Sequence, residues 1–493
     1  MAKQPNILFI LSDDHAAHAI SAYTDNGFGP RILHTPNLDR IADPKQGGVR
    51  ADNCFCTNSI CTPSRASILT GQHTHVCGVK TLADRLDNTH EPQVQKLLKN
   101  AGYRTSIFGK WHLGHGQNAQ GVDSDPAGFD DWAVLPHQGL YYDPTFYVGS
   151  DKGRRGELHT QGYVTDIITD MASEWLDQWD EDYRQNDEPF FMCVHHKAPH
   201  REWEPGPMEK HLFEDQTMAQ PQTLWDDYAT RPAAASVRMR IDRDLLPKDV
   251  KGLPPRELEG RDLKQWYYDR YIKDYLRCCA GIDRNVGRLL DKLQEMGLAE
   301  NTIVVYTSDQ GFFLGDHGFY DKRLIYEHSL RMPLLMRLPN EFKAASHDAM
   351  VTNVDLAPTL LELVGLPVHE QMQGSSFAPM LKGDDEPQDW QQSIYYRYWM
   401  HGDRAHHVPA HYGVRTRTHK LTYYYCKALG CSGAGQINLD LAPHWELFDL
   451  TTDPNELRNI YGESGTETVT AELKTELRRL QDQFADEPVL ESM

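Results

Sequence analysis

The sequence lacks any long apolar segment. No stretch of its 493 residues approaches the roughly 20 consecutive apolar residues that a membrane-spanning helix needs. Residues 6–11 are apolar, but this run is too short for a secretion signal, and Asp13 and Asp14 follow it almost at once. We therefore expect no membrane contact. For the chain as given we expect a cytoplasmic location, or a periplasmic or secreted one if a leader has been removed.

Positive charge is also scarce. The chain has 50 Lys and Arg against 71 Asp and Glu, which gives a formal net charge of −21 at pH 7. Such a surface repels polyanions, so nucleic acid and anionic membranes are not expected partners. An anionic ligand would need a local group of basic side chains to overcome this repulsion.

Cysteine is sparse and irregularly placed. The nine cysteines are an odd number spread over a long chain, which does not fit a disulfide framework. Cys54, Cys56, Cys61 and Cys77 lie loosely together, but their spacing does not repeat as the paired ligands of a structural zinc site do. Neither a disulfide scaffold nor a zinc module is therefore predicted.

What the sequence does contain is an alternation of short apolar runs and long helical patterns. The apolar runs predict buried strands, and the helical periodicity predicts helices between them. The strands are expected at residues 6–11, 104–108, 189–194 and 302–306, and the helices at 93–101, 164–179 and 262–296. Strands that alternate with helices predict an α/β fold whose mostly parallel sheet is covered by helices on both faces.

The pattern breaks in a polar stretch at residues 382–387, where we place a domain boundary. It separates a large domain, residues 1–384, from a smaller C-terminal α+β unit, residues 385–493. Aromatic strand-like stretches and an amphipathic terminal helix predict a small antiparallel sheet with a helix in this unit, and we expect it to contribute to the ligand pocket. These segments are residues 394–399, 421–425 and 469–484.

Polar clusters directly follow four of the predicted strands. They are Asp13-Asp14, Lys110-Trp111-His112, His195 to His200, and Asp309-Gln310. Ligands of open α/β sheets bind at the carboxyl ends of the strands. We therefore expect the four clusters to converge on one edge of the sheet.

Three of these side chains are carboxylates. Any one of them alone is better explained as a helix cap or a solvated turn. Together, Asp13, Asp14 and Asp309 would repel one another by about 4 kcal/mol per pair at ~4 Å and an effective dielectric constant of ~20, so a cation is expected among them. With the amide oxygen of Gln310, this all-oxygen set suits Ca²⁺, with Mg²⁺ as the alternative.

The segment that begins at Cys61 predicts a helix. Thr62 can cap it, Pro63 fits its first turn and Gly71 ends it. Cys61 would then lie just before the helix N-terminus, where the helix dipole favours anions. Two other interpretations stay open: a buried structural cysteine, and a nucleophilic thiolate with His73 or His75 as its base.

Residues 61–65, Cys-Thr-Pro-Ser-Arg, followed by residues 69–71, Leu-Thr-Gly, resemble the signature of the type I, formylglycine-dependent sulfatases of the alkaline phosphatase superfamily. The resemblance covers nearly the whole chain, with further matches in order at 6–14, 109–114, 197–200, 308–333 and 446–457. It implies an alkaline-phosphatase-like fold with residues 1–384 as the sulfatase catalytic domain. It also implies a partner, a maturation enzyme that oxidises Cys61 to formylglycine.

The resemblance implies a mechanism as well. The aldehyde hydrates to a geminal diol that sits on the calcium ion, so that residue 61 is also a metal ligand. One diol oxygen attacks sulfur, the alcohol leaves, and the second hydroxyl then expels sulfate as the aldehyde reforms. A serine in this position would form a stable sulfate ester instead.

Roles for the other residues follow from their charge. Arg65 would hold the diol, while Lys110 and Lys322 would bind sulfate oxygens and stabilise charge in the transition state. His200 is our choice for protonating the leaving alcohol, and His112 would serve the diol as base or share in the leaving-group contact. The sequence does not separate the roles of the two histidines. Gln310 stands where many sulfatases carry asparagine or histidine, which puts the metal affinity in question.

Segments 195–205 and 308–323 look most similar to bacterial sulfatases that act on glycans, either N-acetylglucosamine-6-sulfatases or marine polysaccharide sulfatases such as those for ulvan. The expected substrate is a sulfated saccharide. Lys197 and Arg201 either contact it or form a rim salt bridge. A loop in the C-terminal unit either reads the sugar or is simply solvent-exposed. Its residues are Arg397, His401, His406, His407 and His411.

Rival functions also stay open. A phosphonate or phosphate ester hydrolase, or an arylsulfatase, of the same superfamily would share most of these residues. A non-catalytic sulfoglycan-binding protein would keep Cys61 unmodified, although such a protein has little need for a general acid.

Overall fold

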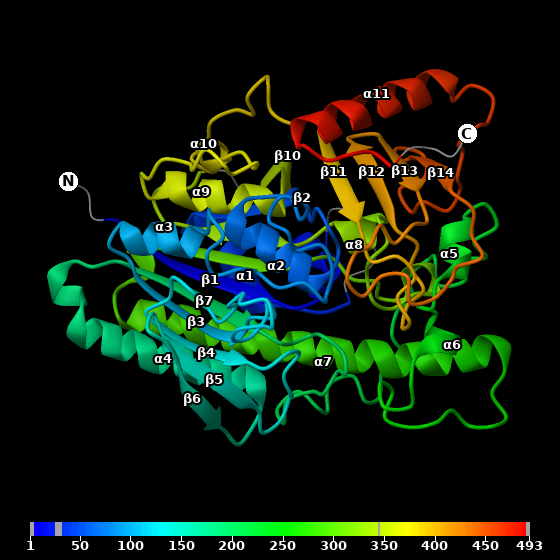
Figure 1. Cartoon of the computed structure of the whole chain (residues 1–493). Coiled ribbons are helices and arrows are strands. Elements are labelled where there is room, and N and C mark those ends of the chain that lie inside the picture. Colours follow the sequence, from blue (N-terminus) through cyan, green and yellow to red (C-terminus); the bar gives the residue numbers. More distant parts are fainter. Residues whose placement is uncertain (1–3, 25–31, 344–345, 490–493) are drawn as a thin grey trace.

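A ten-stranded sheet forms the centre of the computed structural model, which describes residues 4–24, 32–343 and 346–489 (Figure 1). In spatial order its strands are β10 (Ser346–Thr352), β2 (Gly48–Phe55), β9 (Leu334–Arg337), β8 (Thr302–Ser308), β1 (Asn6–Ser12), β7 (Phe190–His196), β3 (Arg104–Lys110), β4 (Asp131–Leu135), β5 (Thr145–Ser150) and β6 (Gly153–His159). All four apolar runs in the large domain are strands of this sheet.

The middle of the sheet is parallel. Strand β1 pairs in parallel with both β8 and β7, and β3 pairs in parallel with β7 and β4. Antiparallel pairs occur toward the edges, where β9 lies between β8 and β2 and where β5 joins β4 to β6. The expected mostly parallel α/β sheet is confirmed, with β10 also parallel to β2.

Helices cover both faces of this sheet, and the side chains of β1 alternate between them. Ile7, Phe9 and Leu11 belong to the hydrophobic cluster on one side, whereas Leu8 and Ile10 belong to the cluster on the other side. The first face carries α2 (Cys61–Thr70), α3 (Val94–Asn100), α9 (Leu356–Leu363) and α10 (Ala378–Leu381), and the second carries α1 (Pro36–Ala42), α4 (Val164–Asp182) and α7 (Gly260–Glu295). A strand buried on both faces reads as a continuous apolar run, which is why β1 was visible in the sequence. Short helices α5 (Pro232–Ser236), α6 (Ile241–Asp244) and α8 (Glu327–Leu330) lie in the connections.

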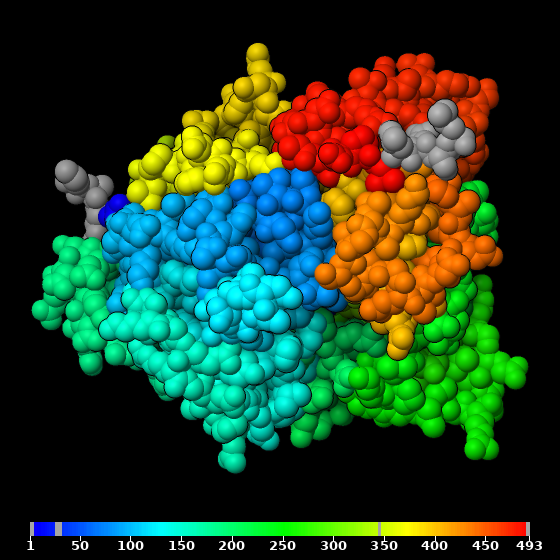
Figure 2. Space-filling model, in the orientation of Figure 1, coloured from blue at the N-terminus to red at the C-terminus, as the bar shows by residue number. Residues whose placement is uncertain are grey.

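The C-terminal part forms a second, four-stranded sheet in the order β11-β12-β13-β14, with every pair antiparallel. Its strands are β11 (Ser393–Tyr398), β12 (His411–Thr416), β13 (His419–Tyr424) and β14 (His444–Asp449), and α11 (Glu467–Gln483) packs on it. Figure 2 shows these orange and red segments lying directly against the blue N-terminal part. Within the described residues, no helix has the length and apolar character needed to cross a membrane.

A buried ion-pair network joins the second sheet to helix α8. The ammonium group of Lys420 on β13, which is fully buried, lies 2.6 Å from a carboxylate oxygen of Glu456 and 2.9 Å from one of Glu327 on α8. Arg415 on β12 also pairs with Glu327, at 3.1 Å. Buried carboxylates that lose their cation are strongly destabilising, because the desolvation of the charge is no longer compensated.

Replacing Lys420 with methionine is therefore expected to lower the free energy of unfolding by about 3–5 kcal/mol, measured by urea denaturation. Arg417→Met is the matched control, because Arg417 lies between β12 and β13 and pairs with Glu386 and Asp348 in a partly exposed position. An exposed pair contributes at most about 1 kcal/mol. If the two substitutions lower the free energy of unfolding equally, this account of the buried ion-pair network is contradicted.

Candidate active site

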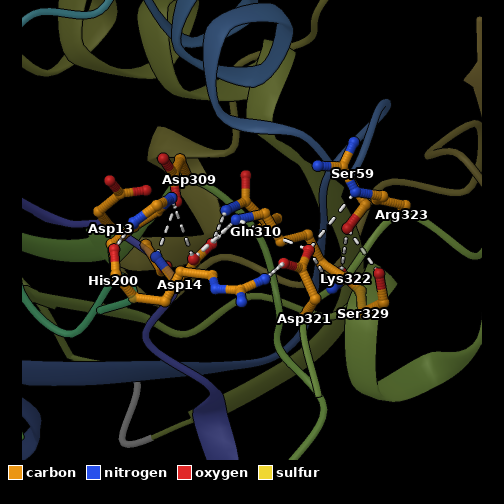
Figure 3. A network of polar contacts seen from close by, with 12 residues as sticks. Asp13, Asp14, Ser59, His200, Asp309, Gln310, Asp321, Lys322, Arg323 and Ser329 are labelled. Atoms are coloured by element: carbon orange, nitrogen blue, oxygen red, sulfur yellow. Dashed lines mark hydrogen bonds and ion pairs between the residues drawn. The ribbon is translucent and has the colours of Figure 1, made fainter. Parts of the chain in front are cut away.

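The four polar clusters do converge, because their strands are neighbours. The order β8-β1-β7-β3 places the carboxyl ends of four parallel strands side by side. Asp309-Gln310 follows β8, Asp13-Asp14 follows β1 and His200 lies in the loop after β7, whereas Lys110 is the last residue of β3. Figure 3 shows the acidic residues, Gln310, His200 and Lys322 gathered in one network.

The acidic residues form a site that suits a hard cation. One carboxylate oxygen from each of Asp13, Asp14 and Asp309 lies within 4.8 Å of the others, and all three side chains are buried. The Oδ1 atom of Asp13 and the Oε1 atom of Gln310 are buried and accept no hydrogen bond. Buried acceptors are ordinarily satisfied, so these two oxygens are available as ligands for Ca²⁺ or Mg²⁺. The Nε2 atom of Gln310 donates to Asp14 at 2.5 Å, so its amide would have to turn for Oε1 to face the same ion.

Burial and mutual repulsion perturb the three carboxylates unequally. Burial, together with the negative charge of Asp13, raises the pKa of Asp309 to about 8. Burial also raises the pKa of Asp14 to about 6, although the cation of Lys322 opposes that shift. Burial alone would raise the pKa of Asp13, but Lys110 holds it well below its usual range. A cation bound among the three carboxyls would relieve this mutual repulsion and favour their ionised forms.

Cys61 lies beside this cluster at the start of α2. Its sulfur and ligand atoms of Asp13 and His200 lie within 4.8 Å of one another. The prediction that Cys61 precedes the helix was wrong by one residue: α2 begins at Cys61, and the extended Ile60 is its N-cap residue. Thr62 does not cap the helix; its hydroxyl donates a hydrogen bond of 2.9 Å to the carbonyl of His112. Gly71 ends the helix in the left-handed conformation, as predicted.

The surroundings of Cys61 do not favour the thiolate interpretation. Burial raises the pKa of the Cys61 thiol despite the nearby lysines, so the group is poorly suited to act as a free thiolate. His73 and His75 follow the far end of α2 and cannot serve as its base. The Nε2 atom of His75 bonds the carbonyl of Phe484 at 2.8 Å, and the ring of His73 packs on the Phe484 ring.

Three cations surround Cys61 and the carboxylates. The ammonium group of Lys110 contacts Asp13 and Gln138, and that of Lys322 lies 2.6 Å from Asp14. The guanidinium of Arg65, one turn into α2, donates to Asp309 at 3.0 Å and to the carbonyl of Lys110 at 2.8 Å. These buried cations offset the charge of the three acids and are placed where an anionic substrate would need local positive charge against the net negative charge of the chain.

Both candidate histidines lie in the cluster. The Nε2 atom of His200 is 3.8 Å from Asp14, and Nδ1 of His112 is 3.3 Å from the hydroxyl of Thr62. Burial and the neighbouring Lys110 hold the pKa of each ring well below its usual range. His112 adopts a positive φ of 57°, a conformation that is uncommon for a residue other than glycine and that often marks a functional position.

A cavity of about 430 Å³ opens beside His200. Lys197 lines it with its ammonium group 4.7 Å from the centre of the Tyr141 ring, and burial lowers the pKa of this lysine to about 8. Arg201 also lines the cavity, but its guanidinium pairs with Asp249 at 2.6 Å. The wall is completed by residues from three loops: Gln138, Gly139, Leu140, Tyr141, Glu202, Glu204, Leu246 and Lys248.

Two predicted substrate residues have their side chains engaged elsewhere. The guanidinium of Arg397 pairs with Asp486 at 2.6 Å and lies over the ring of Trp399. His411 is fully buried, with its ring packed against the rings of Tyr396, Tyr398 and Tyr424. The structure does not bring these residues to the Cys61 cluster. The loop between Arg397 and His411 does approach the Cys61 cluster, because His406 in this loop contacts Asp321, the residue before Lys322.

Several residues that hold the site were not singled out from the sequence. Gln138 contacts Lys110, and the hydroxyl of Ser64 donates to the carbonyl of Asp309. Asn353, after β10, donates to the hydroxyl of Ser64 at 2.9 Å. The position of Ser64 within the 61–65 motif was an available signal, whereas nothing local in the sequence marks Gln138 or Asn353.

Comparison with known proteins identifies the family. The sulfatase family profile matches residues 5–366, and the profile described as N-sulphoglucosamine sulphohydrolase, C-terminal, matches residues 315–483. An N-acetylglucosamine-6-O-sulfatase of Bacteroides thetaiotaomicron is 37% identical over 98% of this chain and 87% of its own length. An ulvan-active sulfatase of Formosa agariphila is 26% identical over 98% of this chain and 82% of its own length.

Comparison with solved structures agrees with this family assignment. One described as a complex with its substrate, D-glucosamine-2-N,6-O-disulfate, superposes with a TM-score of 0.85 at 36% identity and covers 98% of both chains. A phosphonate monoester hydrolase of Agrobacterium radiobacter shares the fold, with a TM-score of 0.72 at 19% identity over 98% of this chain and 96% of that one. The chain belongs to the sulfatase family, the sulfuric ester hydrolases of the alkaline phosphatase superfamily.

Proposed function

We propose that this sulfatase removes the 6-O-sulfate from glucosamine units of sulfated glycans. The carrying observation is the full-length similarity, at 37% identity, to an enzyme named as an N-acetylglucosamine-6-O-sulfatase. The relative whose substrate is a glucosamine 2-N,6-O-disulfate supports the same sugar. The cavity beside His200 offers a place for that sugar next to the group of cations.

The proposed nucleophile is formylglycine made from Cys61 by a maturation enzyme, with Ca²⁺ held by residue 61, Asp13, Asp14, Asp309 and Gln310. When present, the hydrated aldehyde supplies one hydroxyl to attack sulfur and a second to release sulfate. The burial of Cys61 beside the acidic cluster supports this assignment. Mg²⁺ is the alternative cation.

The remaining roles belong to side chains of this chain. Arg65 neutralises Asp309 and orients the nucleophile, while Lys110 and Lys322 bind the sulfate oxygens and stabilise their charge in the transition state. His200 donates a proton to the leaving sugar oxygen. The negative charge of a bound sulfate raises the pKa of this ring toward the operating pH, where a general acid works best. His112 accepts the proton of the nucleophile.

Lys197 and Arg201 are the proposed sugar contacts, since both line the cavity beside His200. Arg201 is already paired with Asp249, so Lys197 has the greater freedom to bind the substrate. Arg397 and His411 are not included among the sugar contacts, because their side chains are engaged elsewhere.

The test is a panel of substrates for protein co-expressed with a formylglycine-generating enzyme. Glucosamine 6-sulfate, N-acetylglucosamine 6-sulfate and the 2-N,6-O-disulfate are compared with galactosamine sulfates, an aryl sulfate, and matched aryl phosphate and phosphonate esters. We expect the 6-sulfated glucosamines to be preferred by at least about tenfold in kcat/KM, because a misplaced hydroxyl leaves buried polar groups unpaired. Activity confined to aryl sulfates, or dominated by phosphonates, would reject the proposed substrate.

A further inference from the structure

The C-terminal sheet touches the reactive part of the site through two tyrosines of β11. The hydroxyl of Tyr396 accepts a hydrogen bond of 3.1 Å from the backbone N–H of Ser59, two residues before Cys61, and donates one of 2.7 Å to the carbonyl of Arg323. The hydroxyl of Tyr398 accepts from the guanidinium of Arg323 at 3.2 Å. One strand thus holds both the segment before Cys61 and the segment after Lys322.

The segment that carries Lys322 needs such support, because its backbone is strained on both sides of the lysine. Asp321 has a φ of 75° and Arg323 a φ of 94°. A positive φ in a residue other than glycine costs on the order of 1–3 kcal/mol and persists only where the surroundings impose it. Between these two residues, the ammonium group of Lys322 lies 2.6 Å from Asp14, and Figure 3 shows these residues in one network.

His406, from the loop between β11 and β12, contacts this strained segment directly. Its Nε2 atom lies 3.2 Å from a carboxylate oxygen of Asp321, and its Nδ1 atom lies 2.9 Å from a carboxylate oxygen of Asp403. The same oxygen of Asp403 accepts the backbone N–H of His406 at 2.9 Å. All three side chains are buried, so the contacts are protected from competition by water.

The loop itself is fixed at this point. The carbonyl of His406 accepts a hydrogen bond of 2.7 Å from the N–H of Arg238 in the catalytic domain. Asp321 also lies 3.5 Å from the guanidinium of Arg323 and 4.0 Å from that of Arg201. Among the ion pairs of the described residues, His406 is the residue of the C-terminal unit that contacts the carboxylate of Asp321.

We propose that His406, held in place by Asp403, is a positioning residue for catalysis: it fixes the carboxylate of Asp321 and so aims Lys322 at the sulfate-binding position. This inference rests on the proposed function of Lys322. It gives the C-terminal sheet a task in the reaction itself, distinct from contact with the sugar. A displacement of about 1 Å of such a group can cost on the order of 10²-fold in rate.

The test is a double-mutant cycle between His406→Asn and Lys322→Ala. Asparagine can still reach Asp403 but is too short to bridge to Asp321. We expect His406→Asn to lower kcat/KM by about 10–100-fold and Lys322→Ala to lower it by about 10²–10³-fold. If His406 acts through Lys322, the double variant matches Lys322→Ala within about twofold, since the two effects are coupled.

Arg404→Gln is the matched control. Arg404 is exposed in the same loop, and its backbone N–H donates to the side chain of Gln436 at 3.1 Å, a contact that the substitution keeps. The kcat/KM of this control variant is expected to stay within about twofold of the wild-type value. If His406→Asn does not fold, Asp403→Asn tests the same link from His406 to Lys322, because it keeps the shape of the Asp403 side chain but removes its charge. The fall in kcat/KM that Asp403→Asn causes must then also vanish in the Lys322→Ala background.

Rates are measured on whichever sulfate ester the wild type hydrolyses fastest, so an error in the proposed sugar does not affect the comparison. Inhibition by inorganic sulfate is measured in parallel, and we expect His406→Asn to weaken it while Arg404→Gln does not. Additive losses in the double variant would overturn the proposal. So would a change confined to KM for the saccharide with unaltered sulfate inhibition, because that outcome identifies a sugar contact.

Discussion

Cys61→Ala is expected to abolish sulfate release, with kcat/KM reduced by at least about 10⁴-fold, as for the loss of the nucleophile in other covalent hydrolases. Residue 61 is the proposed nucleophile, so its substitution leaves the side chains proposed to bind and polarise the sulfate but removes the group proposed to attack it. The measurement is sulfate release by ion chromatography, with thermal unfolding as the check on folding. A folded Cys61→Ala protein that keeps wild-type turnover would remove residue 61 from the mechanism.

Cys61→Ser separates attack on sulfur from release of sulfate. The serine hydroxyl can displace the sugar alcohol, with a new bond between Oγ and sulfur, cleavage of the bond between sulfur and the sugar oxygen, and transfer of the proton to the leaving alcohol. The product is a stable sulfate ester, since serine has no second hydroxyl on the same carbon. We expect one slow turnover and a mass increase of one SO₃ group on the peptide that contains residue 61. Continued turnover without this adduct would contradict the covalent route.

The sequence predicted correctly that the polar clusters at four strand ends lie close together. Buried parallel strands read as apolar runs, so the polar residues after β1, β3, β7 and β8 were visible as clusters at four strand ends. Their convergence then followed from the general placement of ligands in parallel sheets. Lys322 was found differently, through the resemblance, because no strand of the main sheet precedes it directly.

Contacts made by the docking of the second sheet were not predictable. Tyr396 bonds Ser59 and Arg323 across 337 and 73 residues of sequence, respectively, and no local pattern encodes such a pairing. The helix start at Cys61 failed for a related reason: Thr62 prefers the carbonyl of His112 to a local capping position. Tertiary partners overrode a local preference worth about 1 kcal/mol. Arg397 was misjudged similarly, because its partner Asp486 lies 89 residues away.

Removal of the divalent cation should have the second large effect. Chelation is expected to lower kcat/KM by about 10²–10³-fold, the size of several kcal/mol of transition-state stabilisation, and to lower the unfolding temperature as well. An ion that binds the folded chain alone would contribute about 2.7 kcal/mol of stability at about 100 times its Kd. Added Ca²⁺ should restore both quantities, and Mg²⁺ should restore them less well, because Mg²⁺ demands a near-ideal octahedron whereas Ca²⁺ tolerates irregular coordination.

Substitution of one ligand gives the sharper version of this experiment. Asp13→Asn keeps the shape of a side chain whose Oδ1 atom accepts no hydrogen bond, but it removes the charge that attracts the cation. The Ca²⁺-dependent rise in unfolding temperature should therefore shrink or vanish. Asp316→Asn is the control: this buried acid contacts His18 and His328 instead of the acidic cluster, so its variant should keep the full Ca²⁺-dependent rise even if its baseline stability falls. If Ca²⁺ raises the unfolding temperature of Asp13→Asn as much as that of the wild type, the cation binds elsewhere. Loss of one of three clustered negative charges must weaken the binding of a divalent ion among them.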